Sequence, residues 1–252
     1  MRSMVAVTFV LLCALAGRAE AQMDHAMPQG TPTEAAPFGA PVDDQHVFYH
    51  LLFNQLEGRF GDTSAFRWSG EGWLGTDENR LWLRSEAKLS GGQVQDSQQE
   101  LFYSRPISTY FNAMVGGRYD LDSLPGRGWG ALGIEGLAPL FFHVAATGYV
   151  SGDGHLAAKL EGSYDLLISQ RLILQPQIEM NFYTKDDPAR LVGSGLSDID
   201  TGLRLRYEIT RQLAPYIGVT YEGKFGSTAA YAASAGDPIN QVRFAVGLRA
   251  WF

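Results

Sequence analysis

Cysteine chemistry is almost absent from this sequence. The single cysteine, Cys13, lies in an N-terminal segment with a basic start, an apolar core and a small-x-small cleavage site at residues 19–21. Residues 1–21 are therefore predicted to be a secretory signal peptide. The mature chain, predicted to begin at Gln22, then has neither a disulfide nor a thiolate metal site.

Long apolar runs and an excess of positive charge are also missing. After the signal peptide, no segment offers the roughly 18 uninterrupted apolar residues of a transmembrane helix, so the mature chain can enter a membrane only as strands. The 27 acidic residues outnumber the 20 lysines and arginines, and the formal net charge of −7 argues against a nucleic-acid partner. The 29 glycines favour a turn-rich β protein over a helical one.

The C-terminal segment, residues 241–252, alternates with a period of two residues. Val242 and Phe244 share one face of an extended strand, whereas Arg243 and Arg249 share the other. A strand of about 11 residues with one apolar and one polar face suits the wall of a transmembrane barrel. Taken alone, the segment is also compatible with the edge strand of a soluble sandwich. Its final phenylalanine resembles the terminal signal of bacterial outer-membrane barrels.

The same alternation recurs along most of the mature chain. We count about twelve candidate strands from Gln45 onward, separated by turn residues. The polar faces carry charges of both signs, which can pair across a narrow lumen. The predicted fold is all-β, an antiparallel transmembrane β-barrel of about twelve strands over residues 45–252, whose interior is a salt-bridged plug or a narrow channel.

The lengths of the connections suggest an orientation. The even-numbered connections have about four to six residues each, whereas the later odd-numbered ones reach about fourteen, and barrels of this kind have short periplasmic turns and longer outer loops. We therefore expect a bacterial outer-membrane protein with both termini in the periplasm.

Residues 22–44 contain four prolines and no periodic apolar pattern, which predicts a disordered periplasmic tail. Within it, Met23, Asp24, His25 and Met27 bring two thioethers, an imidazole and a carboxylate together. Cu(I) accepts thioether and imidazole ligands well, and a loose tail can wrap them around one ion. The motif is short, and a plain spacer after the signal peptide is the alternative.

Other candidate metal ligands lie in the predicted barrel. On one strand His46 and His50 are about 13 Å apart, too far to chelate a single ion, so each would need a ligand from the tail or a neighbouring strand. Otherwise they are interfacial histidines capping the first strand. His143, His155 and Met114 have lumen parity, but the two histidines are not opposite each other. The alternative is that these histidines bond to neighbouring charges or water.

Longer stretches of the chain resemble a known family. The run at residues 160–229, together with LLFNQLEGR at 51–59, NRLWLRSEA at 79–87, ELFYSRPIS at 100–108 and GLAPLFFHVAATGYV at 136–150, is similar to the copper resistance protein B family of bacterial outer membranes. The pieces occur in order and cover essentially all of residues 45–252. The chain departs from the family pattern in its tail, which has one short Met/His motif instead of an extended series.

The resemblance implies a barrel with a Met- and His-rich N-terminal region, copper ions as ligand and a periplasmic multicopper oxidase as partner. We therefore expect a protein that binds or sequesters copper beside outer-membrane lipid, and not an enzyme. Two alternatives stay open. One is a general passive pore, and the other is a lipid-modifying enzyme, which needs a nucleophile beside a base on the outer wall. No Ser and His have a spacing that places them together on lipid-facing positions.

Overall fold

The structure is a computed structural model and describes residues 46–121 and 126–252. The predicted signal peptide, the tail and its Met/His motif lie outside the described residues. The strands, in chain order, are β1 (Phe48–Phe60), β2 (Ala65–Gly75), β3 (Arg80–Ser90), β4 (Gln93–Pro106), β5 (Phe111–Asp120), β6 (Arg127–Ala138), β7 (Phe142–Ser151), β8 (Leu156–Ser163), β9 (Leu166–Leu167), β10 (Leu172–Tyr183), β11 (Gly195–Tyr207), β12 (Leu213–Lys224) and β13 (Asn240–Trp251).

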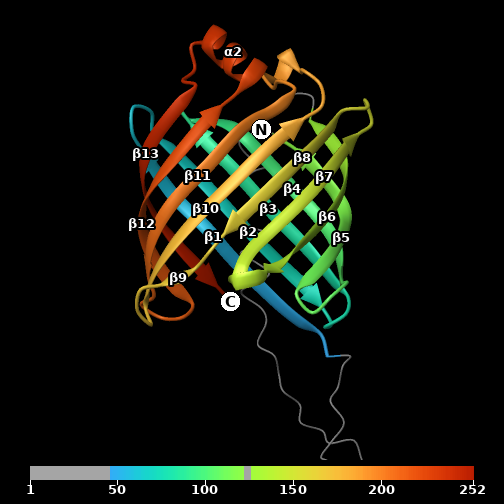
Figure 1. The fold of residues 1–252 in the computed structure, drawn as a ribbon, viewed down its shortest axis with the longest axis vertical. Helices are drawn as coiled ribbons and strands as arrows, with labels where there is room; N and C mark the ends of the chain where they lie inside the picture. Colours follow the sequence, from blue (N-terminus) through green and yellow to red (C-terminus); the bar gives the residue numbers. More distant parts are fainter. Residues whose placement is uncertain (1–45, 122–125) are drawn as a thin grey trace, which may run out of the picture. The chain divides into compact units, whose positions relative to one another are not determined.

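These strands form one closed antiparallel barrel (Figure 1). Apart from β8 and β9, each strand pairs with the next along the chain, and β13 closes the ring by pairing with β1, where Phe60 lies opposite Phe244. Strands β8 and β9 both pair with β10, so they form one interrupted wall strand. Within the described residues the wall therefore has twelve strands, which confirms the predicted fold and strand number.

The interruption between β8 and β9 has a local cause. The register of β8 on β10 places Gln177 opposite Ser163, so Pro176 faces Tyr164, the first residue after β8. Proline has no N–H to donate to a neighbouring strand. The Tyr164 N–H still donates to the Pro176 carbonyl oxygen at 3.1 Å, but pairing is regular again only at β9.

Side chains alternate between the outer surface and the lumen. On β13, Val242 is 65% exposed and Phe244 47%, whereas Arg243 between them is only 4% exposed. On β3, Leu81 is exposed while Trp82 and Arg84 are buried. Because apolar residues face outward and charged residues inward, the wall has the polarity of a membrane barrel.

The connections divide between two ends of the barrel. One, here called the turn end, holds residues 76–79, 107–110, 139–141, 168–171 and 208–212. The other, the loop end, holds residues 61–64, 91–92, 121 and 126, 152–155, 184–194 and 225–239. The last two loop-end connections are long, as expected, but the connections at 61–64 and 91–92 are as short as the turns.

Within residues 46–121 and 126–252 the helical segments are short. They are the 3₁₀ turns η2 (Pro139–Phe141) and η3 (Pro188–Arg190) and the helix α2 (Gly226–Ala235), which lies at the loop end (Figure 1). In the part of the chain that the structure describes, no helix is long and apolar enough to cross a membrane.

Helix α2 is fastened to the loop at residues 184–194. The Gly193 N–H donates to Thr228 Oγ1 of α2 at 2.8 Å, and Ser197 Oγ lies 3.0 Å from the same oxygen. A Cβ atom on Gly193 would lie 2.5 Å from the Thr228 nitrogen, so this close approach requires glycine.

Candidate functional site

A buried carboxylate, Glu57 on β1, organises one side of the lumen. It accepts hydrogen bonds from Arg59 at 2.7 Å, from Arg204 of β11 at 2.9 Å through two nitrogens, and from the Tyr216 hydroxyl of β12 at 3.0 Å. The Glu57 and Arg59 side chains have no exposed surface. Buried charges of this kind are stable only when paired and hydrogen-bonded, and this group satisfies that condition.

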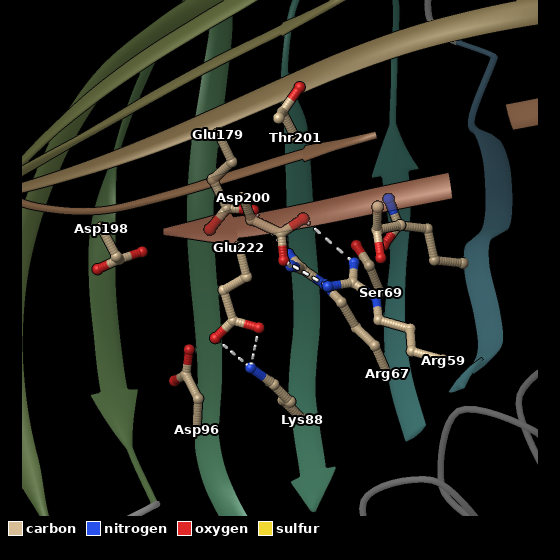
Figure 2. A network of polar contacts seen from close by, with 12 residues as sticks. Arg59, Arg67, Ser69, Lys88, Asp96, Glu179, Asp198, Asp200, Thr201 and Glu222 are labelled. Atoms are coloured by element: carbon tan, nitrogen blue, oxygen red, sulfur yellow. Dashed lines mark hydrogen bonds and ion pairs between the residues drawn. The ribbon is translucent and has the colours of Figure 1, made fainter. Parts of the chain in front are cut away.

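A set of charged side chains from several strands crosses the middle of the lumen. We call it the central ion-pair layer, and it consists of Arg67, Glu86, Lys159, Glu179 and Asp200. Arg67 donates to Asp200 at 2.8 Å and to Glu179 at 2.6 Å (Figure 2). Lys159 lies 2.8 Å from Glu86 and 3.8 Å from Glu179.

Two further groups extend this layer toward the ends of the barrel. Toward the loop end, Glu222 accepts hydrogen bonds from Lys88 (Figure 2) and, at 2.8 Å, from Arg243. Toward the turn end, Arg84 is bonded to Glu135 and lies 3.3 Å from Glu71. Because each pair joins different strands, the ion pairs brace the barrel from within.

Aromatic side chains fill the lumen beside these charges. Trp82, Phe102, Trp129 and Tyr149 form a buried cluster with Met114. The Arg84 guanidinium lies 5.4 Å from the centre of the Trp82 ring and 5.6 Å from that of Phe102, a separation at which a cation is attracted to an aromatic face.

Two cavities lie in the lumen beside these groups. One, of about 600 Å³, is lined by turn-end residues such as Asp77 and Ser108, and the other, of about 760 Å³, by loop-end residues such as Asp187 and Asp237. The two sets of lining residues share only Glu86. The central ion-pair layer therefore separates a turn-end cavity from a loop-end cavity.

The histidines predicted as ligands are distributed between these cavities. His50 and His143 line the turn-end cavity and His155 the loop-end cavity. The His50 ring lies 6.2 Å from the Trp73 ring and 5.8 Å from the Trp251 ring. The register places His143 opposite Ser163, so His143 and His155 are not opposite each other.

The other predicted ligands are placed as follows. Met114 is buried, and its sulfur accepts a long hydrogen bond from Arg84 Nη2 at 3.8 Å. His46 is exposed. Met23, Asp24, His25 and Met27 lie outside the described residues. Across residues 46–121 and 126–252, no group of three or more His, Asp or Glu side chains is arranged to hold a metal ion.

One titratable loop residue has a shifted pKa. Asp186, at the loop end, accepts a hydrogen bond from the Ser194 N–H at 2.6 Å. This bond stabilises the ionised carboxylate and lowers the pKa of Asp186 below its usual value. The loop at residues 184–194 is therefore held partly by a charged group.

The sequence pattern predicted charges of both signs on the lumen face, but it did not single out Glu57, Arg59 or Arg67, and it gave no ion-pair partners. Glu57 and Arg204 are 147 residues apart, and Arg67 and Glu179 are 112 apart. The two-residue period assigned Arg204 and Glu179 to the lumen face. Nothing in the period tells which charge meets which, because this depends on the stagger of strands around the barrel.

Known proteins resemble this chain in sequence and in fold. A family model described as "Copper resistance protein B precursor (CopB)" matches residues 47–252. The chain is 41% identical over 215 residues to "Copper resistance protein B" of Escherichia coli, which covers 85% of the chain and 73% of that protein. The same values hold for the "Copper resistance protein B homolog" of Pseudomonas syringae pv. tomato (strain ATCC BAA-871 / DC3000).

Among solved structures, the NanC porin superposes with a TM-score of 0.53 at 14% sequence identity, covering 81% of this chain and 99% of that one. At this identity the likeness concerns the fold alone, a β-barrel of the outer-membrane porin type. The family match spans every strand of the barrel. The chain belongs to the copper resistance protein B family.

Proposed function

We propose that this chain is an outer-membrane copper-binding protein that serves copper resistance. The observation that carries the proposal is the 41% identity to "Copper resistance protein B", which extends over 85% of the chain. The charged lumen and apolar outer wall of the barrel support a position in the outer membrane, in contact with its lipid.

Copper is bound or sequestered by methionine and histidine ligands. The N-terminal motif of Met23, Asp24, His25 and Met27 supplies the first set, because thioethers and imidazoles suit Cu(I). His50 and His143 at the turn-end cavity are secondary ligands. In this arrangement the tail lies in the periplasm, where a multicopper oxidase is the expected protein partner.

The test is a copper titration of the purified mature chain and of three variants. One variant lacks residues 22–44, one carries Met23→Leu, His25→Gln and Met27→Leu together, and the control carries Met180→Leu on the barrel wall. Both tail variants are expected to lose bound copper, whereas Met180→Leu keeps the full stoichiometry. Equal stoichiometry in the mature chain and both tail variants would remove the tail from the mechanism.

A general passive pore is the second candidate, and the porin-type fold favours it. The central ion-pair layer favours a closed lumen instead, because charged and aromatic side chains separate the two cavities. Conductance in a planar bilayer distinguishes the two. A closed lumen gives little current in potassium chloride, whereas a steady open-channel current would support the pore.

A further inference from the structure

Arg249 of β13 differs from the other arginines of the barrel wall. It lines the turn-end cavity, and its Nε is buried without a hydrogen-bond partner. Every other arginine in the described strands forms an ion pair or a hydrogen bond, including Arg80, which donates to the Thr76 carbonyl oxygen. Arg249 forms neither within the described residues, so its guanidinium keeps its donors available.

A second arginine, Arg206 of β11, lies nearby with donors to spare. Its side chain is 3% exposed, and its Nη2 lies 2.9 Å from Asp165. Its Nε and Nη1 are buried and have no hydrogen-bond partner in the described part of the chain. A planar guanidinium presents five donors, and Asp165 engages one edge of this one.

The register of the sheet brings these two arginines to either side of β12. Arg206 lies opposite Tyr216, and Arg249 lies opposite Ala214, the neighbouring lumen-facing residue of the same strand. Ala214 is only 3% exposed. The two guanidinium groups are close enough to repel each other electrostatically.

A bulge in β1 adds an amide to the same region. Pairing of β1 shifts register between Phe53 and Leu56 on the β13 side, and between Phe53 and Gln55 on the β2 side. The residue common to both irregularities is Asn54, which lines the turn-end cavity. Bulges redirect side chains and are frequent beside binding sites.

We propose that Arg249 and Arg206, with the amide of Asn54, form a binding site for a small oxyanion, either a carboxylate or a phosphate. The guanidinium fork matches the geometry of both anions and binds them through two parallel hydrogen bonds. An anion between the two cations also relieves their mutual repulsion. The carboxylates of Asp165, Glu208 and Glu71 also act on Arg249, so the anion has to compete with them for its guanidinium.

This site uses none of the methionine or histidine ligands proposed for copper, so it stands independently of the copper proposal. It is tested by calorimetric titration of the full mature chain in detergent with inorganic phosphate and, separately, with succinate. Chloride at equal ionic strength is the reference for nonspecific charge effects. The variants are Arg249→Gln, Arg249→Lys and, as the matched control at the same end, Arg105→Gln, whose side chain is 63% exposed.

We expect saturable binding of phosphate, succinate or both, beyond any heat seen with chloride, and the tighter ligand identifies the class of anion. Arg249→Gln should weaken binding by about tenfold or more, because a charge-assisted bidentate pair is lost. Arg249→Lys should weaken it less, and Arg105→Gln should leave it unchanged. The absence of saturable binding by either anion, or an unchanged affinity in Arg249→Gln, would overturn the proposal. Far-UV circular dichroism establishes that each variant retains its barrel.

Discussion

Replacing Glu57 with glutamine removes the one carboxylate that joins Arg59, Arg204 and Tyr216 inside the lumen. Glutamine keeps the size of the side chain but leaves two buried guanidinium groups with fewer negative partners. Arg59 retains Asp200 at 2.5 Å, whereas Arg204 retains only the neutral Gln177 amide oxygen at 3.0 Å. Arg204 is therefore the residue that is left without a negatively charged partner.

The expected cost follows from these contacts. Breaking a buried ion pair by removing one partner typically costs about 3–5 kcal/mol, because the other charge stays buried and unpaired. Since Arg59 keeps an ionic partner, we expect the low end of that range, about 3 kcal/mol of unfolding free energy. Asp153→Asn is the control. The Asp153 side chain is 74% exposed and lies 3.9 Å from Arg127, and a surface ion pair of this kind contributes about 0–1 kcal/mol.

The assay is reversible urea unfolding of the barrel in lipid vesicles, followed by tryptophan fluorescence, with the midpoint converted to free energy through the measured slope. A loss in Glu57→Gln no larger than in Asp153→Asn would refute the reasoning. It would mean that water, and not the carboxylate, satisfies the two arginines.

Three further predictions concern the lumen and the loop end. Lys159→Met should raise the single-channel conductance in a planar bilayer. Glu86, Glu161 and Glu179 would lose the cation that they share, repel one another and admit water. A current equal to that of the unmodified chain would contradict this. In Gly193→Val the new Cβ atom would lie 2.5 Å from the Thr228 nitrogen, so α2 should separate from the loop at residues 184–194 at a local cost of about 1–3 kcal/mol. Faster proteolysis of this loop would show the separation. The pKa of Asp186 is lower in the folded chain than in the unfolded chain, where it is about 4. Its contribution to the order of the loop is therefore complete above the unfolded pKa and is lost as the pH falls through the folded pKa. Amide exchange of the Ser194 N–H, relative to its intrinsic rate, should accelerate on acidification in the native chain but not in Asp186→Asn.

Much of the fold was readable from the sequence because the signal is local. Side chains of a strand point alternately to opposite faces, so the apolar and charged faces of residues 241–252, which form most of β13, could be assigned without knowledge of the neighbouring strands. Turn residues at regular intervals then gave the number of strands. The prediction for loop lengths was less complete, since the connections at 61–64 and 91–92 are as short as those at the turn end.

The candidate site was only partly readable. Lumen parity was predicted for His143, His155 and Met114, but the separation of the two histidines into different cavities and the contact of Met114 with Arg84 required the folded barrel. The copper ligands of the tail stay a prediction.

The sequence by itself determined that strands with one oily and one charged face would build a membrane barrel, because a two-residue period is a property of each strand alone. Only the tertiary structure decided that Glu57 meets Arg204, that Arg67 meets Glu179, and that Arg249 Nε has no hydrogen-bond partner among the described residues. These outcomes depend on the closure of β13 onto β1 and on the stagger of every strand between them. Each charge has a known face from its own position, but its neighbour is set by the whole ring.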